Sequence, residues 1–177
     1  IIPFFPEIYC VAKKIFYILL VLFAILQLFQ PDRNLSSENL KTELANHYAI
    51  PDSVEVLLNT TCYDCHSNNT DYPWFVNVQP IGWYVQSKIN KGKAKLNFSE
   101  FANFDKKEAA DKLNDIENVM NKNSMPINAY SWYNKDAALT IEQREMIAKW
   151  AANLSKQILK DSTAVLNPNS SLYKATN

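Results

Sequence analysis

The segment Cys62-Tyr63-Asp64-Cys65-His66 places two thiols three residues apart and an imidazole directly after them. This arrangement suits three kinds of chemistry, namely a redox-active disulfide, a structural zinc site and the covalent attachment of haem. Two thiols one helical turn apart can each add to a vinyl group of a porphyrin and form thioethers, and the next imidazole can then bind the iron. C-x-x-C-H is the attachment signature of c-type haem, so the spacing favours this third chemistry.

The two alternatives find less support in the surrounding sequence. A disulfide of the thioredoxin type belongs to a β-α-β context, whereas the segments flanking Cys62 have the patterns of helix and loop. Structural zinc takes four ligands, usually as two separated pairs, and only His47 and Cys10 remain outside the motif. In addition, Cys65 and His66 are adjacent, which makes it awkward for both to bind one tetrahedral ion. Covalent haem is therefore the favoured interpretation.

A haem held by His66 needs a group on the other face of its iron. The methionines are Met120, Met125 and Met146, and the second histidine is His47. Met120 and Met146 lie in segments of helical pattern, where we expect core packing. Met125 lies in an irregular segment before a proline, which fixes its own φ and stiffens the loop. Met125 is the predicted distal ligand and His47 the alternative, and a gap-filling core role for Met125 is also considered.

An apolar run near the N-terminus predicts a membrane helix. Lys13 and Lys14 precede residues 15–29, which carry no charge. This run is shorter than the roughly 20 residues of a typical spanning helix, but it ends without the small residues of a signal-peptidase site. We therefore predict a signal anchor over 15–30 rather than a cleaved signal or a buried helix. The lysines predict that residues 1–14 are cytoplasmic and that the chain is a single-pass inner-membrane protein whose remainder faces the periplasm.

The composition favours an all-α domain and excludes several classes of protein. The 18 basic residues balance the 18 acidic ones, so there is no electrostatic footprint for nucleic acid. The chain has 2 glycines, which rules out a glycine-rich phosphate loop and disfavours tight hairpins. A linker is predicted over 31–40, a helical domain over 41–160 and a disordered tail over 161–177.

Helical patterns place several elements in that domain. Capping boxes at Asp105 and Thr140 predict the starts of two helices, the second with an apolar stripe. Helices are also predicted over 37–48, from 51 to the cysteine motif, and from 81 to a stop at Gly92. The segments 67–79 and 121–133 are predicted to be irregular, with Phe98 and Phe101 in the core. The stripe of the last helix comprises Ile147, Trp150, Ala151, Leu154 and Ile158.

Further groups near the motif are expected to support a haem. A ligating histidine usually donates its second ring N–H to a carbonyl, and the carbonyls of Pro73 or Pro80 are the predicted acceptors from His66. Nearby aromatic side chains are predicted to form the apolar wall of the haem and to supply donors to its propionates. These are Tyr72, Trp74, Trp83 and Tyr84.

The stretches CYDCHSNNTDYPWF, QPIGW, GKAKLNFSEF and MPINAY resemble the bacterial haem-binding domain family of membrane-anchored monohaem c-type cytochromes, and more broadly class I cytochromes c. The resemblance covers roughly residues 34–154. It implies a cytochrome c-like helical domain around one haem c, attached at Cys62 and Cys65, with iron bound by His66 and by Met125. Relatives often carry a histidine in the segment matching WYVQSKINKGK, and this chain has none there.

A covalent haem with His66 and Met125 as its iron ligands predicts a function in electron transfer. A His/Met haem has a raised reduction potential and no open coordination site. The predicted protein carries single electrons between extracytoplasmic redox partners, among them a membrane respiratory complex. One rival is a haem peroxidase or a gas or redox sensor with an open distal face, where His47 would be the available acid–base group. Another is an assembly subunit of a larger respiratory complex.

Overall fold

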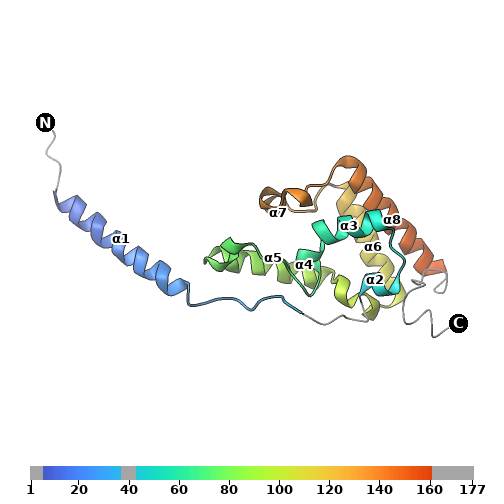
Figure 1. The fold of residues 1–177 in the computed structure, drawn as a ribbon, viewed down its shortest axis with the longest axis horizontal. Helices are drawn as coiled ribbons and strands as arrows, with labels where there is room; N and C mark the ends of the chain where they lie inside the picture. The colour runs from blue at the N-terminus through green and yellow to red at the C-terminus, as the bar shows by residue number, and fades with distance from the viewer. Residues whose placement is uncertain (1–5, 37–42, 161–177) are drawn as a thin grey trace. The chain divides into compact units, whose positions relative to one another are not determined.

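The computed structural model describes residues 6–36 and 43–160, and within them it contains helices and turns but no strand (Figure 1). This confirms the predicted all-α class; the predicted tail over 161–177 lies outside the described residues. The α-helices are α1 (Pro6–Leu26), α2 (Leu44–His47), α3 (Asp52–Thr61), α4 (Tyr63–His66), α5 (Ile81–Lys95), α6 (Lys106–Asn121), α7 (Asn128–Tyr133) and α8 (Ile141–Lys160). The 3₁₀ helices are η1 (Trp74–Asn77), η2 (Phe98–Asn103) and η3 (Lys135–Ala137).

The chain forms two compact units. The smaller contains the N-terminal residues up to Arg33 together with residues 72–88, and the larger contains residues 34–71 and the chain from residue 89 onward. Two segments predicted to be irregular contain short helices, η1 in the smaller unit and α7 in the larger. The cysteine motif belongs to the larger unit.

Helices α6 and α8 form the core of the larger unit by packing along each other. The predicted apolar stripe of α8 is buried from Ile147 to Ile158, and Leu113 of α6 is fully buried. Met120 is buried as expected, but Met146 is 41% exposed and does not pack in the core. Met146 lies one turn before Trp150, at the margin of the stripe, where solvent reaches it. Each fully buried large apolar side chain contributes about 1.5–3 kcal/mol.

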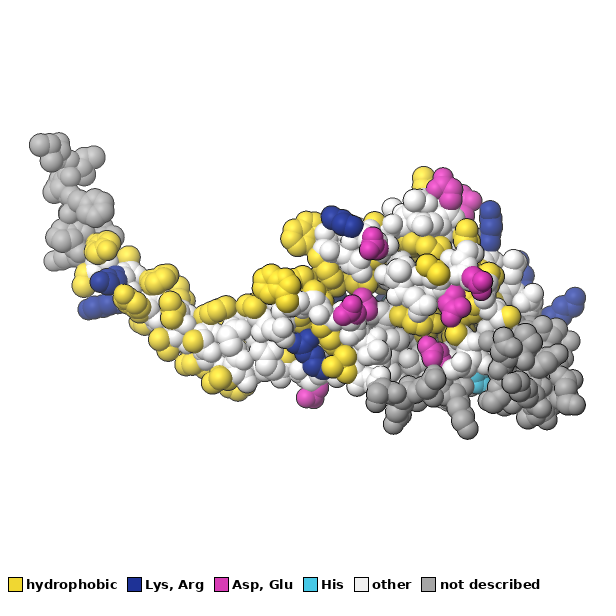
Figure 2. Space-filling model, in the orientation of Figure 1, with side chains coloured by type: hydrophobic (Ala, Val, Ile, Leu, Met, Phe, Trp, Pro, Cys, Tyr) yellow, Lys and Arg dark blue, Asp and Glu magenta, His cyan; other side chains and the backbone are white. Residues whose placement is uncertain are grey.

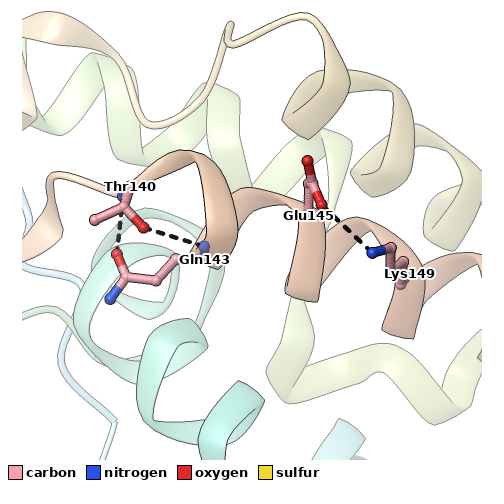
Figure 3. Close-up of polar contacts among 4 residues, drawn as sticks. All are labelled: Thr140, Gln143, Glu145 and Lys149. Atoms are coloured by element: carbon pink, nitrogen blue, oxygen red, sulfur yellow. Dashed lines mark hydrogen bonds and ion pairs between the residues drawn. The ribbon is translucent and has the colours of Figure 1, made fainter.

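The predicted N-caps are present at the starts of α6 and α8, and the one at Thr140 is a complete capping box. The carboxylate of Asp105 accepts a hydrogen bond from the backbone N–H of Glu108 at 2.8 Å. Thr140 and Gln143 bond reciprocally, at 2.9 Å and 3.2 Å (Figure 3). These bonds satisfy backbone donors that the first helical turn leaves without partners, and so fix where each helix begins.

Helix α1 is longer than the apolar run that predicted it. It begins at Pro6 rather than Ile15 and has 21 residues, which corresponds to a length of about 31 Å. Its stretch Tyr9–Leu26 has a mean hydropathy of 2.1 and is 0% buried. The length matches the hydrocarbon core of a bilayer, about 30 Å. One N-terminal helix is thus compatible with a membrane anchor, and also with a signal sequence.

Candidate functional site

The cysteine motif forms a single tight turn between α3 and the end of α4. The backbone N–H of Cys62 donates to Leu58, which closes α3, and the carbonyl of Cys62 then accepts from Cys65 at 3.1 Å and from His66 at 3.0 Å. The two thiols and the imidazole therefore lie on one helical turn. The structure brings these three predicted site residues together.

Burial keeps both thiols of this turn protonated. It raises the pKa of the Cys62 thiol to about 12, with a further contribution from Cys65. Burial, followed by the carboxylate of Asp64, raises the pKa of Cys65 to about 11. Oxidoreductases with a C-x-x-C motif have the opposite property, a lowered thiol pKa. Within the described residues there is also no cluster of three or more His, Cys, Asp and Glu side chains that could hold a metal ion.

The imidazole of His66 is oriented by a carbonyl that the sequence did not indicate. Its Nδ1 lies 3.0 Å from the carbonyl oxygen of Leu96. Burial lowers the pKa of His66, so the neutral ring carries its proton on Nδ1, donates it to Leu96 and leaves the lone pair of Nε2 for a metal. The prediction of Pro73 or Pro80 as acceptor was wrong, because α5 continues past Gly92 and so brings Leu96 to the ring.

Gly92 is placed where α5 passes the cysteine motif, and it does not end the helix as predicted. A Cβ at this position would lie 2.5 Å from the carbonyl oxygen of Cys65. Only glycine permits such a close approach of two backbones. The helix therefore runs on to Lys95, and the backbone N–H of Leu96 still donates to Gly92 at 2.9 Å. Gly92 therefore allows α5 to pack closely against the backbone of Cys65, although its local pattern is that of a helix end.

Asp64, between the two cysteines, holds the turn in place through all of its oxygen atoms. Its Oδ1 accepts from the backbone N–H of Asp71 at 3.0 Å, and its carbonyl accepts from the Thr70 hydroxyl at 2.6 Å. Its Oδ2 accepts from the hydroxyl of Tyr130 in α7 at 2.6 Å. Burial and the nearby carboxylate raise the pKa of Tyr130. No motif or spacing in the sequence singles out Tyr130, which is recognisable only as one aromatic residue among many.

Replacement of Tyr130 by phenylalanine is expected to lower the free energy of unfolding by about 1.5 kcal/mol, since a hydrogen bond to a charged group is lost. Guanidinium denaturation of the haem-loaded protein measures this. Tyr84→Phe is the matched control, because Tyr84 is 53% exposed and its replacement should change stability by less than about 0.5 kcal/mol. If the effects of Asp64→Asn and Tyr130→Phe are additive in the double variant, the two groups are not coupled and the interpretation is wrong.

Met125 lies between α6 and α7, half-buried against the same apolar core that contacts Cys62. Its carbonyl accepts a hydrogen bond from the guanidinium of Arg144. His47 ends α2, half-buried, with its ring centroid 6.2 Å from that of Tyr48. Met125 as distal ligand and His47 as the alternative both stay predictions.

The aromatic side chains predicted to wall the haem belong to the smaller unit, whereas His66 belongs to the larger. The hydroxyl of Tyr72 donates to Gln86 at 2.7 Å, and the indole N–H of Trp83 donates to the carbonyl of Phe29 at 2.8 Å. Two of the four residues predicted to supply donors to haem propionates, Tyr72 and Trp83, therefore already donate to protein groups.

Two buried polar side chains beside the cysteine turn, Thr61 and Tyr63, lack a hydrogen-bond partner within the described residues. Three buried atoms have no hydrogen-bond partner within the described part of the chain, namely Thr61 Oγ1, the Tyr63 hydroxyl and Trp150 Nε1. Thr61 and Tyr63 flank Cys62. The donor set therefore fits a covalently held haem, with two thiols on one turn, an imidazole with a free Nε2 and unsatisfied polar atoms beside them.

A cavity of about 520 Å³ adjoins the same turn and is lined in part by Tyr63 and Asp64. Most of its lining is polar, so it suits water and polar solutes better than a porphyrin ring. The remaining lining residues are Ser36, Glu43, Asn59, Ser67, Asn68, Asn69, Asp71 and Ser99.

Comparison with known proteins agrees with this chemistry. A family model described as "Haem-binding domain" matches residues 21–153, from the last part of α1 through most of α8. No curated protein and no solved structure matches the chain. Since the match covers most of the sequence and includes the whole cysteine turn, the chain belongs to the haem-binding domain family.

Proposed function

We propose that this protein is a membrane-anchored monohaem c-type cytochrome that carries single electrons between extracytoplasmic redox partners. The observation that carries the proposal is the turn on which Cys62 and Cys65 lie beside an imidazole whose Nδ1 is already bound to Leu96. Haem, when bound there, supplies reversible one-electron exchange at its iron. The two thiols would hold the porphyrin, and Nε2 of His66 would be the proximal ligand.

The chain prepares His66 for this role before any metal is bound. The carbonyl of Leu96 fixes the tautomer and the ring orientation, and it raises the basicity of the other nitrogen. Burial lowers the pKa of the imidazole and so favours the neutral form that can bind a metal. The ring of Phe98 packs edge-on against His66, with 6.3 Å between the ring centroids.

Met125 is the proposed distal ligand. Two observations support it: its side chain and Cys62 pack against one core, and Arg144 holds its backbone carbonyl. A His/Met pair raises the reduction potential and leaves no open coordination position. This favours electron transfer over the rival functions of a peroxidase or sensor.

We further propose that α1 is retained as a single-pass anchor in the inner membrane, with the haem domain in the periplasm. Gln27 and Gln30, just after α1, hydrogen-bond with Gln79, whose side chain is 0% exposed. Cleavage beyond Gln30 would remove both partners from the buried amide of Gln79, so the contacts support retention. The anchor would confine encounters with redox proteins, including a membrane respiratory complex, to the plane of the membrane.

The Met125→Ala variant tests the proposed ligation. The ferric wild-type protein is expected to show a low-spin spectrum with the far-red sulfur-to-iron charge-transfer band, and the variant should lose this band and become high-spin. Met146→Ala is the matched control, since Met146 is 41% exposed on α8 and its loss should leave the band intact. A wild-type spectrum that is already high-spin and unchanged in Met125→Ala would contradict His/Met ligation and favour an enzyme or sensor.

A further inference from the structure

The smaller unit carries an uncharged segment with several exposed apolar side chains. Residues 72–87 contain no Asp, Glu, Lys or Arg. We call the exposed apolar side chains of this segment the aromatic collar. Its members are Trp74, Ile81, Trp83 and Tyr84, with exposed fractions of 78%, 43%, 37% and 53%. Exposed apolar side chains that recur within one uncharged stretch of sequence commonly mark an interaction surface.

The segment that carries the collar is bonded to the chain just past α1. The Gln79 backbone N–H donates to Gln27 Oε1 at 2.8 Å, and its side-chain Nε2 donates to Gln30 Oε1 at 2.8 Å. The indole N–H of Trp83 donates to the carbonyl of Phe29 at 2.8 Å. These bonds are long-range in sequence and involve the fully buried Gln79, so they fix the collar to the end of the helix.

A second set of contacts extends this attachment toward Arg33. The Arg33 guanidinium lies 4.4 Å from the centroid of the Tyr72 ring and donates to the Asn77 side chain. Gln30 Nε2 donates to the carbonyl of Asn77 at 3.2 Å. The polar groups of the two segments thus satisfy one another inside the unit, while the side chains of the collar keep 37–78% of their surface exposed.

The length of α1 sets the depth at which the collar would lie. With Lys13 and Lys14 at the cytoplasmic interface, residues 15–26 of α1 supply about 18 Å of helix across the hydrocarbon core, and the apolar residues just past Leu26 complete the crossing. Leu28 and Phe29 follow Leu26 and are 79% and 62% exposed. Hydrophobic side chains cover α1 up to this end (Figure 2). Residues bonded to 27–33 would therefore lie at the level of the lipid headgroups, the region that Trp and Tyr prefer.

We propose that the aromatic collar inserts into the periplasmic interface of the bilayer, and that lipid is the partner of this surface. The absence of charge, the continuity with α1 and the Trp and Tyr content all fit the boundary between headgroups and acyl chains. The proposal rests on the retained anchor of the proposed function, but on no property of the haem. It makes the collar of residues 72–87 a second membrane contact in addition to the spanning helix.

Spin labels on the haem-loaded full chain test this in phosphatidylcholine/phosphatidylglycerol nanodiscs, with the iron reduced and Cys10→Ser removing the exposed native thiol. One label replaces the collar residue in Trp74→Cys. Trp132→Cys in α7 is the matched control, because Trp132 is 77% exposed and belongs to the larger unit. Leu20→Cys reports whether α1 is inserted. Collisions with oxygen, relative to those with a water-soluble nickel complex, measure the depth of each label.

The ratio of oxygen to nickel collisions is expected to be several-fold higher at position 74 than at 132, and highest at 20. A label at 74 that matches an aqueous label at 132 would overturn the collar while leaving the anchor intact, and an aqueous label at 20 would overturn both. Equal interfacial values at 74 and 132, or a label at 74 shielded from both reagents by protein, would also overturn the proposal. If Trp74→Cys fails to load haem, Tyr84→Cys tests the same prediction.

Discussion

A variant in which both Cys62 and Cys65 are replaced by alanine is expected to carry no covalently attached haem. The two thiols are the only cysteine side chains in the turn, and each would form one thioether to the porphyrin. Acid–acetone extraction should remove all haem from this variant and none from the wild type. Haem staining after denaturing electrophoresis and the intact mass check the result, and the wild-type mass should exceed that of the chain by one haem.

Cys10→Ala is the control for this experiment. Cys10 is exposed in α1, so its replacement should leave covalent haem unchanged. Single replacement of Cys62 or Cys65 should leave one thioether, with reduced haem content and a spectrum shifted by the unsaturated vinyl group. Covalent haem in the double variant would contradict c-type attachment, and a wild-type mass without haem would contradict the proposed cofactor.

The elements that depend on local patterns could be predicted from the sequence. The caps at Asp105 and Thr140 mark where α6 and α8 begin, since a cap involves residues only three positions apart. The stripe from Ile147 to Ile158 is buried because helical periodicity sets which face of α8 meets the core. The cysteine motif likewise lies on one turn because its geometry depends on neighbouring residues.

The supports of the site could not be predicted, because they are distant in sequence. Leu96 lies thirty residues beyond the imidazole that it orients, and Tyr130 lies farther still from Asp64. Gly92 has the local pattern of a helix stop, but the carbonyl of Cys65 decides its role through space. Such contacts depend on how the helices pack against one another, and local sequence patterns do not specify that packing.

The residue at which α1 begins could not be predicted from its apolar run. The apolar run alone predicts a span over 15–30, whereas helical backbone extends from Pro6 to Leu26. Lys13 and Lys14 do not interrupt the helix, because lysines have good helix propensity and their long side chains can extend toward an interface. Lys13 and Lys14 therefore mark where the apolar run begins, but not where the helix begins.

Replacement of Phe98 by alanine is expected to lower the free energy of unfolding by about 3–5 kcal/mol and to disturb the haem spectrum as well. Phe98 is 1% exposed, its ring centroid lies 5.1 Å from that of Tyr63, and its ring edge packs against His66. Denaturant unfolding measures the stability. The pattern of haem methyl shifts in the ferric protein reports the orientation of the axial imidazole.

Phe101→Ala separates these two effects, because Phe101 is 0% exposed but packs against Tyr48 and Phe104 rather than against the histidine. Phe101→Ala should therefore lower the free energy of unfolding by a similar amount. It should leave the haem methyl shifts near those of the wild type. Phe98→Leu, which keeps most of the volume, should restore most of the stability but not the edge-on contact with His66. If Phe101→Ala perturbs the shifts as much as Phe98→Ala does, general loosening of the core explains the effect. If only the Phe98 variants perturb the methyl shifts, the ring of Phe98 holds the imidazole of His66 directly. Leu96 and Phe98, two residues apart in one short segment, then orient the imidazole together.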